Sequence, residues 1–108
     1  MKANGKVLPA IATQAPALTV LIARDNSGYM ARCPELDLVT EMDHSEDAFK
    51  AIMEMIREYA KDYRKRLKAY ASSPNRAHHR PYIDRINGCW NEWEIRELIG
   101  VRYGRLHI

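Results

Sequence analysis

The stretch that decides the fold is DHSEDAFKAIMEMIREYAKDYRKRLKAYA, at residues 43–71. When this stretch is placed on a helical wheel at about 100° per residue, its apolar side chains fall on one broad arc and nearly all of its charges fall on the other side. Glu46 and Asp47 stand in the first turn and basic residues crowd the last turns, as the helix dipole favours. The pattern predicts one long amphipathic helix. Its apolar arc consists of Ala48, Phe49, Ile52, Met53, Met55, Ile56, Tyr59, Ala60, Tyr63, Leu67 and Tyr70.

Two details at this helix are left open by the pattern. Arg66 is the one charge that falls within the apolar arc. Asp43, His44 and Ser45 all offer side chains that could cap the first turn, and the sequence does not say which one is the N-cap. For His44, a capping role is a better interpretation than that of a general base.

Three β-patterned runs precede the helix, at residues 17–25, 29–33 and 36–42. The first run alternates strongly apolar with milder side chains, which is typical of a strand with one face in the core. Residues 25–28 read DNSG and predict a turn, while Pro34 ends the second run because proline cannot donate to a strand ladder. The sequence therefore predicts an α+β fold in which the helix covers a three-stranded antiparallel meander.

Composition and length indicate one globular domain. The 108 residues are 46% hydrophobic and 29% charged, and no stretch is long and apolar enough to span a membrane. We expect an N-terminal arm at residues 1–16, a sheet-and-helix domain at residues 17–71 and a basic C-terminal extension at residues 72–108. Cys33 and Cys89 are far apart and match no metal or redox spacing, which favours two reduced thiols in a cytoplasmic protein.

A family resemblance rests on the second predicted strand, the third strand and the start of the helix. Residues 28–36 read GYMARCPEL, residues 39–40 read VT, and residues 46–48 read EDA at the first turn of the helix. This order resembles the HicB-like antitoxin family, whose members read Gly-aromatic-x-Ala-x-x-Pro-Glu-Leu, then a short strand ending in Gly-x-Thr, then Glu-Glu-Ala. The resemblance covers about residues 17–70.

The resemblance implies a truncated ribonuclease H-like sheet and helix. It also implies that the protein binds and neutralises a small RNA-cleaving toxin and represses its own operon. Met42 stands where the family usually has Gly and His44 where it usually has a capping Thr, so the turn from strand to helix is expected to differ.

The C-terminal extension begins after the turn-rich stretch at residues 72–75. A short helix is predicted at residues 81–86, followed by Gly88. Residues 92–99 fit either a helix or a strand, with the helix preferred, and residues 101–108 alternate as a final strand. A helix-turn-helix formed by the two short helices is a less favoured alternative.

No catalytic constellation, cofactor motif or metal motif stands out. His78 and His79 are adjacent, which is poor spacing for one metal ion, so both are expected to be solvent-facing loop residues. Asp37, Glu41 and Asp43 alternate along one predicted strand and would be a metal-dependent nuclease site only if acids from other strands joined them. We therefore expect a protein that is not an enzyme.

Two sets of residues are candidates for binding. The formal net charge is +3, with the basic excess in the second half of the chain, and this permits contact with nucleic acid. Trp90 and Trp93 lie outside the sheet-and-helix unit, and they either dock the tail onto it, which is the preferred interpretation, or anchor a partner. The candidate nucleic-acid residues are Lys61, Arg64, Lys65, Lys68, Arg76, Arg80 and Arg85.

These observations predict an antitoxin-type binding protein that sequesters a small protein partner, with a nucleic-acid-binding regulatory module as the alternative. Self-association into at least a dimer is expected as well. A three-stranded meander leaves unpaired edges, and the second face of the first strand is apolar enough to require cover.

Overall fold

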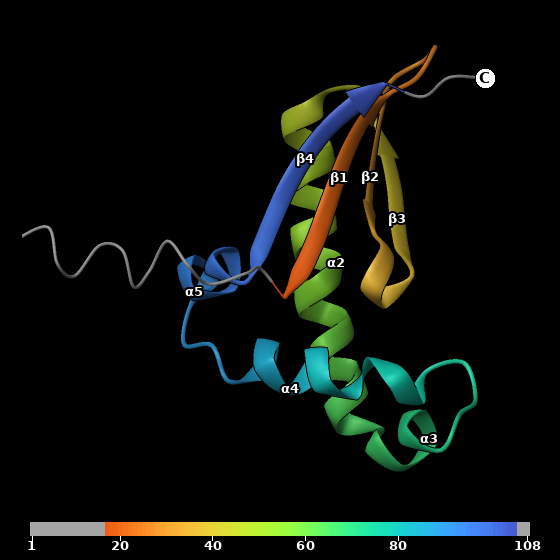
Figure 1. Ribbon diagram of the computed structural model, residues 1–108, viewed down its shortest axis with the longest axis vertical. Helices are drawn as coiled ribbons and strands as arrows, with labels where there is room; N and C mark the ends of the chain where they lie inside the picture. The colour runs from red at the N-terminus through yellow and green to blue at the C-terminus, as the bar shows by residue number, and fades with distance from the viewer. Residues whose placement is uncertain (1–16, 106–108) are drawn as a thin grey trace, which may run out of the picture.

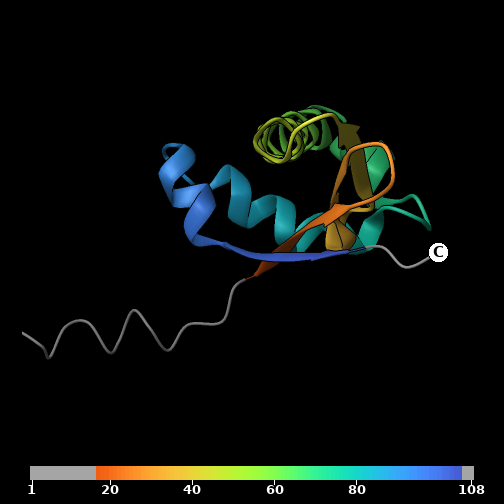
Figure 2. The ribbon, with the colours of Figure 1, turned by 90° about the horizontal axis from the view of Figure 1, so that it is seen from above.

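The computed structural model describes residues 17–105, which form a four-stranded sheet with helices packed against it (Figure 1). The strand order is β3-β2-β1-β4. Figure 2 shows the helices on one side of this sheet. The predicted α+β class is confirmed. The elements are β1 (Leu18–Arg24), β2 (Tyr29–Cys33), the 3-10 helix η2 (Pro34–Leu36), β3 (Leu38–Met42), α2 (Ser45–Lys65), α3 (Leu67–Ala71), the 3-10 helix η3 (Ala77–His79), α4 (Arg80–Asn87), α5 (Glu92–Glu97) and β4 (Ile99–Arg105).

The first three strands form the predicted antiparallel meander. β1 pairs with β2 and β2 pairs with β3, both antiparallel. The turn between β1 and β2 is held by the Asp25 carboxylate, which accepts hydrogen bonds from the backbone N–H groups of Ser27 and Gly28. Gly28 is required by sterics, because a Cβ atom there would lie 2.6 Å from the carbonyl oxygen of Met42. The third strand was predicted to begin at Leu36 but begins at Leu38, because Leu36 ends η2 and Asp37 has a left-handed backbone with φ of 56°.

The meander is not the whole sheet, and this corrects the sequence prediction. β4 pairs with β1 in parallel along all seven residues of β1, from Leu18 opposite Ile99 to Arg24 opposite Arg105. The predicted final strand therefore exists but begins two residues earlier, and residues 106–108 lie outside the described chain. Because β4 occupies the free side of β1, the edges of the sheet are β3 and β4.

α2 runs across the three strands of the meander and buries one side of its surface against them. The predicted helix over residues 43–71 is divided at Arg66, whose φ of −116° and ψ of 41° interrupt the helical backbone before α3. Arg66 is largely exposed and its Nε atom lies 3.4 Å from the Asp62 carboxylate. A continued helix would have turned this charge toward the apolar side. His44 takes the N-cap position, but its side chain makes no capping hydrogen bond.

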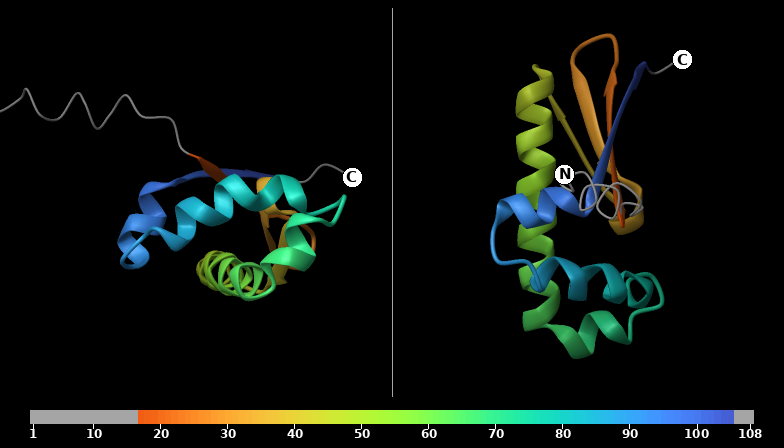
Figure 3. Two further views of the ribbon diagram at one scale, coloured as in Figure 1. Left: turned by 90° about the horizontal axis from the view of Figure 1, so that it is seen from below. Right: turned by 60° about the vertical axis from the view of Figure 1, so that its left-hand side comes forward.

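The core includes residues from both sides of the predicted boundary at residue 72. The side chains of α2 and the meander that form its centre are joined by three isoleucines of the C-terminal segment. The view at the right of Figure 3 shows α4 and α5 crossing beside α2 at two levels along its length. The three isoleucines are Ile83 and Ile86 of α4 and Ile95 of α5.

The C-terminal helices differ from the prediction in detail. α4 begins at Arg80, one residue before the predicted start, and α5 ends at Glu97, so that Ile99 already belongs to β4. Residues 92–99, for which the sequence allowed a helix or a strand, are therefore helical over most of their length. α4 packs on α2, but few contacts join α4 to α5, so they do not form the compact pair of a helix-turn-helix. Between residues 17 and 105, no helix combines the length and apolar character that crossing a membrane requires.

Candidate functional site

Two tryptophans are among the most exposed large apolar side chains that the structure describes. Trp90 is 91% exposed and Trp93 is 69% exposed. Neither side chain docks the tail onto the rest of the protein, so that interpretation of these residues is wrong. On β4, Tyr103 is 78% exposed as well. We call Trp90, Trp93 and Tyr103 the exposed tail aromatics.

Two hydrogen bonds at the start of α5 fix the backbone that carries the two tryptophans. The Asn91 side chain accepts a hydrogen bond from the backbone N–H of Glu94 at 3.0 Å. The Glu94 carboxylate in turn accepts one from the backbone N–H of Trp90 at 2.7 Å. This pattern is related to a capping box, except that Glu94 bonds the residue before the N-cap Asn91, and the two bonds hold the turn before α5 in one conformation. Both indoles therefore extend into solvent from an ordered turn.

Charged contacts attach α5 to α2. Glu92 lies 3.6 Å from Arg57 of α2 and 3.0 Å from Arg96 of its own helix. The guanidinium of Arg96 lies over the ring of Phe49, 5.2 Å from its centroid. Each of these surface contacts contributes little alone, but together with buried Ile95 they define where α5 lies.

A hollow of about 260 Å³ lies beside Trp90, between α2 and the segment that joins α4 to α5. Arg57 and Lys61 line it from α2, and the largely buried Ile86 and Ile95 contribute only small apolar parts of its surface. Basic and apolar groups thus stand next to an exposed indole. Such a combination is typical of surfaces that bind a partner.

The seven predicted nucleic-acid residues are all exposed, but the structure brings only some of them together. Arg64 of α2 and Arg80 of α4 line the same hollow of about 370 Å³ between these helices. Arg76 is directed elsewhere, with its guanidinium 5.3 Å from the ring centroid of Tyr59 and 5.5 Å from that of Tyr70. The remaining four, Lys61, Lys65, Lys68 and Arg85, are distributed over α2, α3 and α4.

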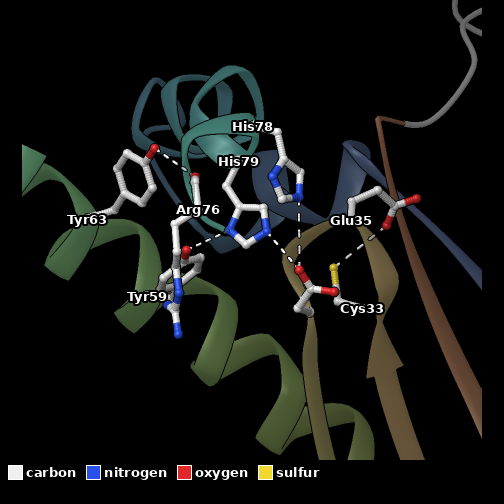
Figure 4. A network of polar contacts seen from close by, with 8 residues as sticks. Cys33, Glu35, Tyr59, Tyr63, Arg76, His78 and His79 are labelled. Atoms are coloured by element: carbon white, nitrogen blue, oxygen red, sulfur yellow. Dashed lines mark hydrogen bonds and ion pairs between the residues drawn. The ribbon is translucent and has the colours of Figure 1, made fainter. Parts of the chain in front are cut away.

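A polar network connects η3 with α2 and with the turn before β3 (Figure 4). His79 is only 1% exposed, and its Nδ1 and Nε2 atoms lie 2.6 Å from the Tyr59 hydroxyl and 3.0 Å from Asp37 Oδ2, respectively. Burial lowers the pKa of His79, an effect that its hydrogen bond to Asp37 opposes. The Tyr63 hydroxyl donates to the carbonyl of Arg76 at 3.0 Å and fixes the residue at the start of η3.

One of the two histidines does not lie as the sequence predicted. His78 is exposed, but His79 is buried, because η3 turns its ring between α2 and the sheet. The Nε2 atom of His78 lies 4.0 Å from the same Asp37 oxygen that contacts His79. The prediction of a solvent-facing side chain is wrong for His79, because no sequence signal connects positions 37 and 79.

The acids considered as a nuclease site do not converge. Asp37 faces the histidines, whereas Glu41 shares a hydrogen bond with Asp25 that raises the pKa of the Glu41 carboxyl. In residues 17–105, the one group of three or more His, Cys, Asp or Glu side chains with ligand spacing consists of Asp37, His78 and His79. The geometry thus does not support the arrangement of Asp37, Glu41 and Asp43 around one ion.

Comparison with known proteins gives a fold and a family. The structure is similar to a crystal structure of the antitoxin part assigned to a toxin/antitoxin system from Syntrophomonas wolfei subsp. wolfei, with a TM-score of 0.69 and 19% sequence identity. The match covers 95% of this chain and 73% of that one, and at this identity it supports the fold alone. No curated protein matches the chain.

The sequence itself provides the assignment. Residues 10–101 match the PHD-like family, described as the antitoxin of RelE/RelB toxin–antitoxin systems. The expectation of an antitoxin is confirmed, while the HicB-like assignment of residues 17–70 stays a prediction. Since the match extends over most of the 108 residues, the chain belongs to the PHD-like family of RelE/RelB-type antitoxins.

Proposed function

We propose that this antitoxin neutralises the toxin of its own system by binding it directly in the cytoplasm, through a surface centred on Trp90 and Trp93. The observation that carries the proposal is the exposure of Trp90, at 91%, on a turn that the hydrogen bonds of Asn91 and Glu94 hold in place. Tryptophan is over-represented among the residues that dominate binding energies, and a preordered anchor loses little conformational entropy on binding. The protein acts by association and needs no reaction centre.

The chemistry of the surroundings supports this choice of surface. The hollow beside Trp90 offers the apolar indole itself, small exposed parts of Ile86 and Ile95, and the basic groups of Arg57 and Lys61. We infer that an apolar segment of the toxin with an acidic neighbour would fit there. The toxin would be an RNA-cleaving enzyme, as the family resemblance of residues 17–70 to HicB-like antitoxins implies.

Co-expression with the toxin encoded in the same operon tests the function. Wild-type antitoxin should restore growth and co-purify with the toxin. A variant with Trp90→Ala and Trp93→Ala should do neither, although its circular dichroism spectrum is unchanged. Asn26→Ala, at the exposed tip of the β1–β2 turn, is the matched control and should behave as wild type. Full rescue by the double variant would refute the proposed surface.

We also propose that the protein self-associates through the face of the sheet opposite α2. Side chains alternate across a strand, so the register places Leu21, Met30 and Val39 on that face. Val39 is 54% exposed, and no helix among residues 17–105 covers it. Light scattering should give at least a dimer for wild type and for Val39→Thr, and a monomer for Val39→Glu. A monomeric wild type would contradict this.

A second function, operator DNA binding, is favoured by the convergence of Arg64 and Arg80 on one hollow. Phosphate contacts make the affinity fall steeply with salt concentration. Arg64→Ala should therefore weaken binding to operator DNA and reduce the salt dependence by about one contact. The proposal fails if the wild-type protein does not shift the operator fragment at low salt.

A further inference from the structure

Three side chains from two distant segments converge where η3 meets the turn before β3. Asp37, His78 and His79 each offer one ligand atom, and these atoms lie within 4.8 Å of one another. We propose that they form a binding site for a zinc-class divalent metal ion, held by Asp37 Oδ2 and the Nε2 atoms of both histidines (Figure 4). This role is separate from toxin binding and does not depend on it.

The ligand set and its spacing suit such an ion. Zinc is bound in proteins by imidazole nitrogens and carboxylate oxygens at about 2.0–2.2 Å, which in a tetrahedron separates the ligand atoms by about 3.3 Å. The distances from Asp37 Oδ2, 3.0 Å to His79 and 4.0 Å to His78, lie on either side of that value. His78 and Asp37 are exposed, so small side-chain rotations can adjust the site and water can supply a fourth ligand.

Tyr59 completes the site from the other side of the buried ring. Histidines that bind metals usually donate their second N–H to a nearby oxygen, which fixes the ring orientation and the tautomer. The Tyr59 hydroxyl lies 2.6 Å from Nδ1 of His79 and can accept that hydrogen bond. Metal binding at Nε2 then requires only that the ring proton sits on Nδ1. Burial favours the neutral imidazole that this chemistry needs.

One neighbouring charge opposes a cation. The guanidinium of Arg76 lies over the ring of Tyr59, and its positive charge helps to lower the pKa of His79. The Asp37 carboxylate is the negative charge that compensates it, since it contacts both histidines. An ion at this position would join η3 to the sheet and so stabilise the attachment of the C-terminal segment.

Zinc titration of the full-length, tag-free protein, followed by competition with a chromogenic chelator, tests the site. His78→Ala is the decisive variant, because His78 is exposed and its removal leaves the contacts of His79 with Tyr59 and Asp37 intact. We expect one Zn²⁺ per chain for wild type and an affinity at least about tenfold weaker for His78→Ala. His44→Ala is the matched control, an exposed histidine elsewhere on the surface, and should bind as wild type.

Cobalt provides an independent readout, since a tetrahedral Co²⁺ complex gives visible absorption that His78→Ala should abolish. The proposal is overturned if wild type binds no Zn²⁺, if His78→Ala binds as tightly as wild type, or if His44→Ala loses the ion.

Discussion

Asp37 Oδ2 lies 3.0 Å from Nε2 of His79, although the two residues are separated by 42 positions in the chain. This contact connects the turn between η2 and β3 with the short helix η3 that comes after the long helical region. Because His79 also contacts Tyr59 of α2, one buried ring bridges the sheet, α2 and η3. The C-terminal segment is thereby attached to the fold at residue 79, a point in the chain that precedes β4.

The Tyr59–His79 contact should contribute measurably to stability. Tyr59→Phe removes the hydroxyl and leaves Nδ1 of the buried imidazole without its partner. An unsatisfied buried polar atom costs about 1–3 kcal/mol, so the free energy of unfolding in urea should fall by that amount. Tyr103→Phe removes a hydroxyl from a side chain that is 78% exposed and should leave stability unchanged. Equal stability of the two variants would show that the contact is not formed.

The close approach at Gly28 predicts a second stability effect. In Gly28→Ala the new methyl group would lie 2.6 Å from a backbone oxygen of Met42, so the β1–β2 turn or the end of β3 must move. Such overpacking typically costs about 1–3 kcal/mol, which thermal unfolding would detect. Gly104→Ala is the control, because no atom lies within 4 Å of its added Cβ. The account is contradicted if Gly28→Ala is as stable as that control.

Cys33 should be chemically inert in the folded protein. Burial and the nearby Glu35 charge raise the pKa of Cys33 to about 12, so the thiol stays protonated at neutral pH. Alkylation at pH 8 should modify the partly exposed Cys89 first and reach Cys33 only on unfolding. Mass spectrometry of the modified peptides measures this order, and modification of Cys33 before Cys89 would be inconsistent with it.

The same raised pKa predicts how stability changes in alkali. The folded state holds the Cys33 proton, whereas the unfolded thiol loses it near its ordinary pKa of about 8.5. The contribution of this group to stability is therefore complete below that pH and decreases as the pH rises toward 12. Cys33→Ala should show a smaller loss of stability over this interval than wild type. If the stability of both proteins falls equally with pH over this interval, Cys33 is not a buried neutral thiol.

The local pattern was sufficient to predict the meander, the turn at residues 25–28 and the helix over most of α2. Each of these elements depends on side-chain alternation or on turn residues within a few positions. The pairing of β4 with β1 was not predicted, because a parallel pair between residues 18–24 and 99–105 leaves no local signal in either strand. The same reason explains the missed burial of His79, whose environment is provided by Asp37 and Tyr59 from distant positions.

The break in the helix at Arg66 could be predicted from the sequence only in part. Its position inside the apolar arc was visible in the sequence, yet helix propensity alone gave no reason to end the helix there. In the structure, the backbone departs from helical geometry at this residue and the charge reaches Asp62 at the surface. For Trp90 and Trp93, the sequence identified the residues, but their exposure could be decided only by the fold.

The affinity of the purified antitoxin for the toxin of its operon tests the central claim most directly. Isothermal titration calorimetry should show tight binding by wild type. Trp90→Ala, which removes a largely exposed indole from the ordered turn, should weaken the affinity by more than about tenfold, as expected for a residue that dominates an interface. Binding by Trp90→Ala that equals the wild type, or no binding by wild type at all, would contradict the account.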